Sequence, residues 1–270
     1  MRQSTAATTN PLLKELSRQP GEGNAAWGLR AAKAMKTANP KAWTHLVLFG
    51  GSDLLSFRVR VAQSHLRQDM LPSFWSDAAL IVLDRKDVGS TEMFRVPLLQ
   101  PEGTDFAAWS NGVVATPLSA FDDAARWPNV ALIAMPVAQD QVLRAVGEFM
   151  RSRDDLDALA LVLRWLAFAW GSERAGNPLH DNCGLPSACM LESVFAREQF
   201  DLTPGIESRR SCPESIWAAA KRWHEYYGAT AARLSQREDG VPVGRYVIDH
   251  QLPIADDTGS SLVQRLIRGG

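Results

Sequence analysis

Short apolar runs of strand length dominate the first half of the chain, whereas patterns with helical spacing dominate the second half. The expected strands are residues 45–49, 77–83, 92–98, 112–116, 130–135 and 244–249. The expected helices are residues 25–37, 53–68, 139–151, 156–170, 186–197 and 213–227. Strands gathered ahead of helices favour segregated layers over an alternating α/β arrangement, so the sequence predicts an α+β fold.

The composition narrows the functional classes. A formal net charge of −1 over 270 residues gives no reason to expect nucleic acid, whose binders carry basic faces. No membrane span is expected, because the most apolar helix pattern, residues 156–170, is too short and is interrupted by Arg164. Residues 1–10 are polar and lack the apolar core of a secretory signal, so a cytoplasmic protein is predicted.

We expect one domain with an extension at each end. Residues 1–23 are polar and contain proline and glycine, which is typical of a flexible arm. Residues 24–254 contain all the expected strands and helices and are predicted to form a single α+β domain. Residues 255–270 are predicted to be a C-terminal tail.

Two local patterns suggest a phosphate site and a metal site, but neither has the residues that such a site usually requires. Gly50-Gly51-Ser52 lies between a strand and a helix, where backbone N–H groups attract anions, but it lacks the spacing of the known phosphate-binding loops. A metal site would need more ligands than the nearby pair of His180 and Cys183. The three cysteines, which are Cys183, Cys189 and Cys212, are odd in number, so no disulfide framework is expected either. Neither a cofactor nor a metal is predicted.

Two segments, one around residue 77 and the other around residue 187, carry a family resemblance. Trp75-Ser76-Asp77 begins an expected strand, and Ser187 lies in the first turn of the helix expected over residues 186–197. Asp201-Leu202-Thr203-Pro204 follows that helix, and Phe49-Gly50-Gly51 ends an earlier strand. Together these motifs resemble the circularly permuted branch of the NlpC-type papain-like fold, a superfamily of cysteine peptidases and acyltransferases.

The resemblance implies an antiparallel sheet packed with helices, with further helices added between the strands and the Ser187 helix. In that family a base histidine begins an early strand and a nucleophilic cysteine begins a late helix. Here those positions are Asp77 and Ser187. The next strand often supplies an acidic or polar third residue, and Glu92 takes that position. A serine hydroxyl needs a well-placed base and a carboxylate is a weak proton acceptor, so loss of the Cys-His dyad is predicted.

Cys183 is a further candidate nucleophile. It precedes helix 186–197, and the dipole at a helix N-terminus favours a thiolate. Cys183-Gly184 is also similar to the Cys-Gly start of bacteriocin-processing peptidases, which are papain-like and place their histidine after the cysteine. The candidate bases for a relocated site are His65, His180 and His250.

The resemblance therefore predicts a bacterial protein that kept a papain-like fold but lost its dyad. Such a protein would serve as a binding or assembly component and hold a peptide, a lipid-like group or a protein partner in the former cleft, with a protein or peptide expected. The alternative is an active cysteine or serine hydrolase or acyltransferase that acts on an amide or ester through Cys183 or Ser187. A third hypothesis is a nucleotide-binding enzyme that uses the Gly50-Gly51 turn.

Overall fold

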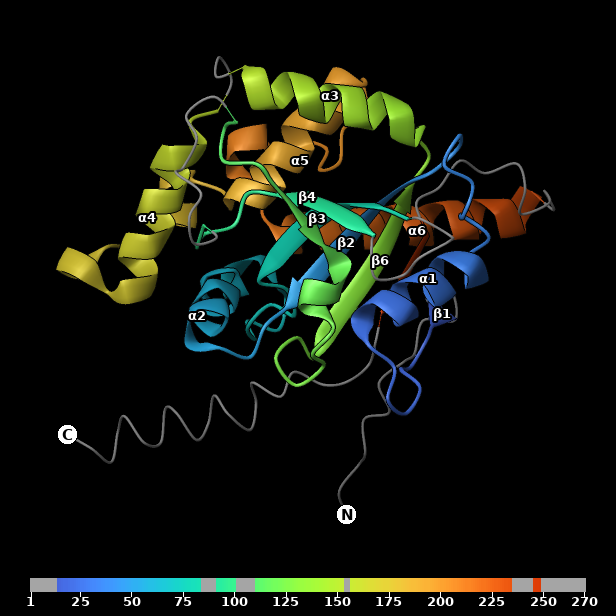
Figure 1. Ribbon diagram of the computed structural model, residues 1–270, viewed down its shortest axis with the longest axis horizontal. Coiled ribbons are helices and arrows are strands. Elements are labelled where there is room, and N and C mark those ends of the chain that lie inside the picture. Colours follow the sequence, from blue (N-terminus) through green and yellow to red (C-terminus); the bar gives the residue numbers. More distant parts are fainter. Residues whose placement is uncertain (1–13, 84–90, 101–109, 153–155, 235–244, 249–270) are drawn as a thin grey trace.

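The computed structural model describes residues 14–83, 91–100, 110–152, 156–234 and 245–248. Its strands form one sheet in the order β1-β7-β6-β2-β3-β4-β5 (Figure 1). Neighbouring strands pair antiparallel, except that β1 and β7 pair in parallel. The strands are β1 (Lys14–Glu15), β2 (Thr44–Gly50), β3 (Asp77–Val82), β4 (Glu92–Arg95), β5 (Val114–Pro117), β6 (Asn129–Met135) and β7 (Arg245–Ile248).

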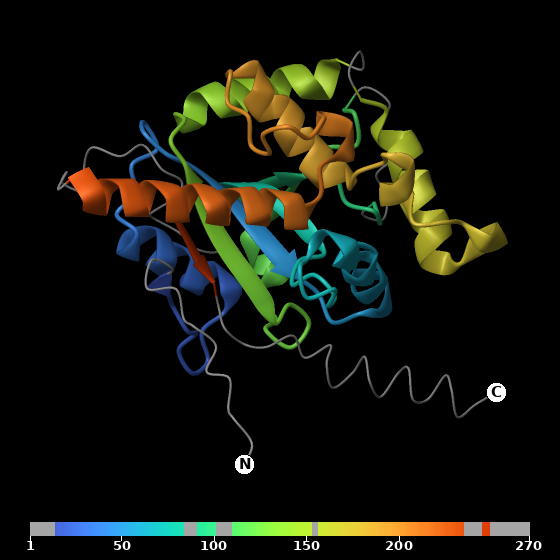
Figure 2. The ribbon, with the colours of Figure 1, turned by 180° about the vertical axis from the view of Figure 1, so that it is seen from behind.

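Helices cover both faces of this sheet. They are α1 (Asn24–Ala34), α2 (Leu54–Ala62), α3 (Gln139–Arg151), α4 (Ala158–Trp170), α5 (Pro186–Arg197) and α6 (Pro213–Leu234). Figures 1 and 2 show α1 on one side of the sheet and α3, α5 and α6 on the other. The predicted α+β class is confirmed, and the predicted antiparallel sheet is found in five strands, β6, β2, β3, β4 and β5.

Strand alternation divides the core into two clusters. Leu46 and Leu48 of β2 belong to a cluster with the apolar faces of α3, α4, α5 and α6, whereas Val47 and Phe49 belong to a cluster with α1. Every residue of β2 is buried because successive side chains enter opposite clusters. Both faces of the sheet are therefore buried at its centre. For that reason the sequences of β2, β3 and β6 are nearly continuous apolar runs.

The helix that carries Ser187 lies directly on the sheet. Helix α5 packs against β3 and against α3. Helices α3 and α4 come between the strands and α5 in the chain, as expected, but they do not separate α5 from the sheet in space. Pro186 opens α5 at its first turn, where a missing backbone N–H costs nothing.

The described part of the predicted N-terminal arm is attached to the domain. β1 pairs with β7, and the Trp27 indole donates to the carbonyl of Leu16 over 2.6 Å. Residues 14–23 thus belong with the domain, since their backbone supplies an edge strand and covers a buried tryptophan. Residues 1–13, the end of the predicted domain at residues 249–254 and the predicted tail at residues 255–270 lie outside the described residues.

Candidate functional site

Ser187 is buried and its hydroxyl is bound to the backbone of one residue. It is 2% exposed, and its Oγ donates to the Val96 carbonyl over 3.0 Å and accepts from the Val96 N–H over 3.1 Å. A backbone carbonyl is not a proton acceptor that could activate a nucleophile. The hydroxyl therefore joins the start of α5 to the chain just beyond β4.

Asp77 is bound to a residue that sequence reasoning did not select. Its Oδ2 lies 2.5 Å from Nη1 of Arg95, and its Oδ1 accepts the N–H of Ala78 over 2.8 Å. The Arg95 guanidinium in turn lies 4.9 Å from the centre of the Phe121 ring. Asp77 is thus held in an ion pair that is mostly shielded from solvent.

The sheet separates Asp77 from Ser187. Asp77 alternates in phase with Ala79 and Ile81, which belong to the cluster on the α1 side, as does the Phe121 ring beneath Arg95. Ser187 lies on α5, which packs on the opposite face with Ala188 and Cys189. The two residues therefore do not face each other across the sheet, although both border a pocket at its end.

Glu92 lies away from both residues. The antiparallel register pairs it with Val82, at the end of β3 opposite to Asp77, and its side chain is exposed. Arg95, at the other end of β4, is the charged residue that the register brings to Asp77. No signal in the sequence fixes that register, which is why Arg95 was not among the candidates.

The pocket at the sheet end has a volume of about 190 Å³. Its polar and charged lining comes from the start of α2, the start of β3, the end of β4, the chain before β6 and the start of α5. These residues are Asp53, Ser56, Ser76, Asp77, Arg95, Arg126 and Ser187. The apolar wall consists of Leu55, Val59, Val96, Pro97, Leu98, Leu99, Trp127, Leu185 and Pro186.

Cys183 is half-buried beside an arginine. Its Sγ accepts from Nη1 of Arg164 over 3.3 Å, and its thiol is 3.5 Å from the carbonyl of Asp181. It does not line the pocket that Ser187 and Asp77 share. The structure does not join Cys183 to a histidine through any hydrogen bond among the described residues.

The candidate bases lie elsewhere or outside the described chain. The rings of His65 and His180 lie 5.0 Å apart, edge to face, and His65 Nδ1 lies 3.1 Å from the carbonyl of Ala62. The Ser187 hydroxyl has both of its hydrogen bonds with Val96, so neither histidine bonds it. His250 lies outside the described residues.

The Gly50-Gly51-Ser52 turn has no free amides for a phosphate. The N–H of Gly51 donates to Ser76 Oγ over 3.0 Å, and that of Ser52 donates to the Arg126 carbonyl over 3.0 Å. The Asp53 carboxylate caps α2 by accepting the N–H of Ser56. An anion at this helix start would meet a carboxylate already in place, so the turn is a strand-to-helix connection.

Other buried titratable groups do not line the pocket at the sheet end. Burial raises the pKa of Glu192 to about 7, against the lowering effect of hydrogen bonds from the Thr203 hydroxyl and N–H. Burial also raises the pKa of Glu214, which accepts the Ser73 hydroxyl over 2.6 Å. In β2, burial lowers the pKa of His45 to about 4.

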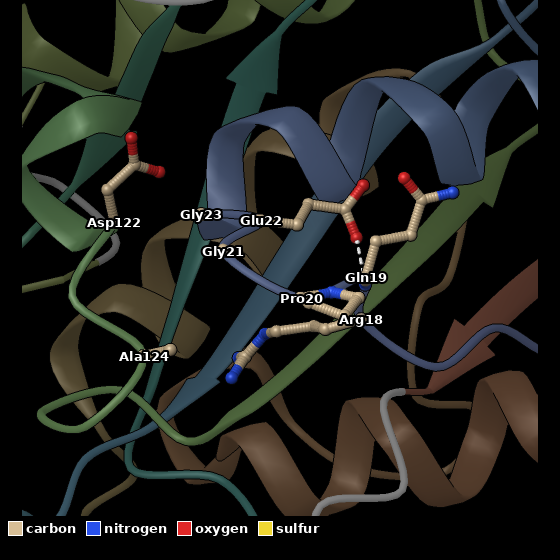
Figure 3. Close-up of a pocket in the computed structure, with 8 residues that line it drawn as sticks. All are labelled: Arg18, Gln19, Pro20, Gly21, Glu22, Gly23, Asp122 and Ala124. Atoms are coloured by element: carbon tan, nitrogen blue, oxygen red, sulfur yellow. Dashed lines mark hydrogen bonds between the residues drawn. The ribbon is translucent and has the colours of Figure 1, made fainter.

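Two larger hollows share no lining residue with the pocket at the sheet end. One, of about 490 Å³, surrounds the turn before α1, where Figure 3 shows the Glu22 carboxylate turned to the backbone of Gln19. Its carboxylates are already bound, because Glu22 pairs with Arg30 and Asp122 accepts the N–H of Ala25. The other hollow, of about 590 Å³, is an apolar groove along α6, lined by the exposed rings of Trp223 and Tyr226 among others.

Neither the described residues nor the comparisons with known proteins point to a particular activity. Among the described residues, no three His, Cys, Asp or Glu side chains come together as a metal site requires. Within the same residues, no helix combines the length and the apolar character needed to cross a bilayer. No protein-family model matches the chain, and neither the curated proteins nor the solved structures contain a match.

Proposed function

We propose that this protein is a papain-like binding or assembly component without the Cys-His dyad, which holds a protein or peptide partner at the end of its sheet. One observation carries the proposal: the Ser187 hydroxyl has both its hydrogen bonds with the Val96 backbone. A hydroxyl whose proton is held by a carbonyl has no general base to activate it.

The arrangement of Asp77 supports the same proposal. Its carboxylate is neutralised by Arg95 and lies in phase with the α1 side of the sheet. The Asp77 carboxylate therefore contacts the Arg95 guanidinium and not the Ser187 hydroxyl, which among the described residues bonds only Val96. The two positions at which the family places its base and nucleophile therefore serve as structural contacts in this chain.

The papain-like assignment itself is supported by topology. An antiparallel run of strands, β2-β3-β4-β5, carries Asp77 at the start of β3, and a late helix begins with Ser187 beside the end of β4. This is the chain order that the permuted branch implies. In this proposal the pocket that both Asp77 and Ser187 line takes the position of the former cleft.

Covalent labelling tests the loss of the dyad. The full chain would be treated with a fluorophosphonate, which reacts with activated serines, and modified peptides would be mapped by mass spectrometry. We expect no adduct at Ser187, because its hydroxyl is buried and lacks a base. An adduct at Ser187 that disappears in Ser187→Ala would overturn the proposal and establish a serine hydrolase.

The alternative hydrolase through Cys183 has its own readout. Arg164 beside the Sγ atom is the observation that favours it, since a neighbouring cation stabilises a thiolate. The rate of iodoacetamide labelling at Cys183 would be compared in the native chain and in urea. We expect slower labelling in the native chain, because the thiol is half-buried and donates to a carbonyl; faster native labelling would indicate an activated nucleophile.

A further inference from the structure

The pocket at the sheet end contains hydrogen-bond donors that the fold does not use. Arg95 pairs with Asp77 through Nη1, and its Nε is buried without a partner among the described residues. Its Nη2 likewise makes no hydrogen bond with a residue that the structure describes. A buried charged donor without an acceptor is unfavourable, so an acceptor is expected at this group.

Arg126 adds a second guanidinium to the same pocket. It lies 5.6 Å from the centre of the Trp127 ring, and its side chain is exposed. Within the described part of the chain, the guanidinium takes part in neither an ion pair nor a hydrogen bond. The backbone of Arg126, by contrast, is anchored by Ser52 and Asp123, which fixes the point from which the side chain extends.

The two carboxylates of the pocket already accept hydrogen bonds from neighbouring residues. Asp53 accepts both the N–H and the hydroxyl of Ser56, and Asp77 accepts Arg95 and the N–H of Ala78. Guanidinium groups only donate hydrogen bonds, so a ligand must bring the acceptor. With the charges of Asp53 and Asp77 offsetting those of the two arginines, the site favours a single negative charge over a phosphate dianion.

The size and the wall of the pocket restrict the ligand further. A volume of about 190 Å³ is below the range of about 300–1,000 Å³ that is usual for small-molecule and cofactor pockets, so the pocket is too small for a nucleotide. Pro97, Leu98 and Leu99 form an apolar wall beside the arginines, and Leu99 is 57% exposed. An apolar side chain next to a carboxylate would satisfy both parts of the pocket.

We propose that Arg95 and Arg126 bind the carboxylate at the C-terminal end of a partner peptide whose last side chain is apolar and packs on Leu98 and Leu99. The inference rests on the proposed function, because it names the partner chemistry for the same pocket. Two guanidinium groups from different segments, β4 and the chain before β6, then recognise one carboxylate.

Calorimetric titration with synthetic peptides tests the inference. The probes are acetyl-alanyl-leucine with a free carboxylate, the same peptide as its C-terminal amide, acetyl-aspartyl-leucine amide with a side-chain carboxylate, and inorganic phosphate. We expect the free acid to bind in the millimolar range or tighter and the amide to bind at least tenfold more weakly, since hydrogen bonds to a charged group are lost.

Arg126→Gln is the informative variant, because among the described residues the guanidinium makes no hydrogen bond or ion pair and only lies over the Trp127 ring. We expect it to weaken the free acid about tenfold or more and to leave the amide unchanged. Arg144→Gln on α3 removes the same charge from an exposed i,i+4 pair with Asp140 and should not alter binding. Arg95→Lys, which keeps a cation for Asp77, should also weaken the free acid.

Each other outcome overturns the inference. Equal binding of acid and amide would show that the carboxylate is not recognised, and no binding of either would show that the pocket does not take a peptide end. Tighter binding of the aspartyl peptide or of phosphate would assign the arginines to a different anion. None of these results depends on the labelling of Ser187, so the loss of the dyad is tested separately.

Discussion

At the scale of single residues, Ser187 occupies the position of a nucleophile but stabilises the fold through two hydrogen bonds with the Val96 backbone. Ser187→Ala removes one donor and one acceptor and leaves the buried N–H and carbonyl of Val96 unpaired. Each unpaired buried group costs about 1–3 kcal/mol, so we expect the free energy of unfolding, measured by urea titration, to fall by about 2–6 kcal/mol.

Ser193→Ala on the same helix is the matched control. Its hydroxyl donates to the Cys189 carbonyl one turn earlier, a carbonyl that lies within the helical hydrogen-bond ladder. Loss of this bond leaves no backbone group without a hydrogen bond, so the free energy of unfolding should fall by less than about 1 kcal/mol. Equal losses in the two variants would contradict the special role of the Ser187 hydroxyl.

At the scale of elements, the end of β2 approaches the chain before β3 too closely for any side chain. A Cβ on Gly50 would lie 1.9 Å from the Phe74 carbonyl, which is a backbone atom that cannot rotate away. Gly50→Ala should therefore destabilise the protein by more than about 2 kcal/mol, since the strand end must shift. Thermal unfolding of the variant would measure this.

Gly28 in α1 gives the opposite expectation. A Cβ there meets no atom within 4 Å, and the residue lies inside a helix. Gly28→Ala should stabilise the protein by about 0.5–1 kcal/mol through helix propensity. A destabilised Gly28→Ala, together with a tolerated Gly50→Ala, would show that the packing around β2 and α1 differs from this description.

The sequence predicted most elements well because their signals are local. Val130 to Met135 is a continuous apolar run, and Pro186 and Pro213 mark helix starts. The predicted strand over residues 92–98 ends instead at Arg95, since the Val96 backbone bonds Ser187 and Pro97 lacks an N–H. Such partners come from a segment ninety-one positions away and leave no local pattern.

The site was less predictable than the fold. The permuted resemblance pointed to Ser187 and Asp77, and both border one pocket. Arg95 and Arg126 were not selected, because their position at that pocket depends on the register of β4 and on the loop before β6. Charged residues in a sequence with near-zero net charge carry no signal until the fold brings them together.

At the scale of the whole molecule, two buried groups give opposing dependence of stability on pH. The pKa of His45 is lowered to about 4 in the folded state, so its contribution is present above pH 6.5 and is lost as the pH falls towards 4. The pKa of Glu192 is raised to about 7, so its contribution is present below pH 4.5 and is lost as the pH rises towards 7.

Glu192→Gln should leave His45 as the main cause of the change in unfolding free energy with pH. We expect the free energy of unfolding of the variant to rise between pH 4.5 and 6.5 more steeply than that of the native chain, by up to about 1.4 kcal/mol per pH unit. His45→Gln should do the reverse and leave a fall between pH 4.5 and 7. Urea titrations across this range would measure both, and superimposable profiles would contradict the assignment of either group.

The parallel pairing of β1 with β7 has a mechanical consequence. Two residue pairs, Lys14 with Val247 and Glu15 with Ile248, connect the first and last strands that the structure describes. If the two ends were pulled apart, parallel strands would slide past each other and both pairs would bear the load together. β7 is joined to β6 by four pairs, so the first event under tension should be the release of β1, with the rest of the sheet still intact.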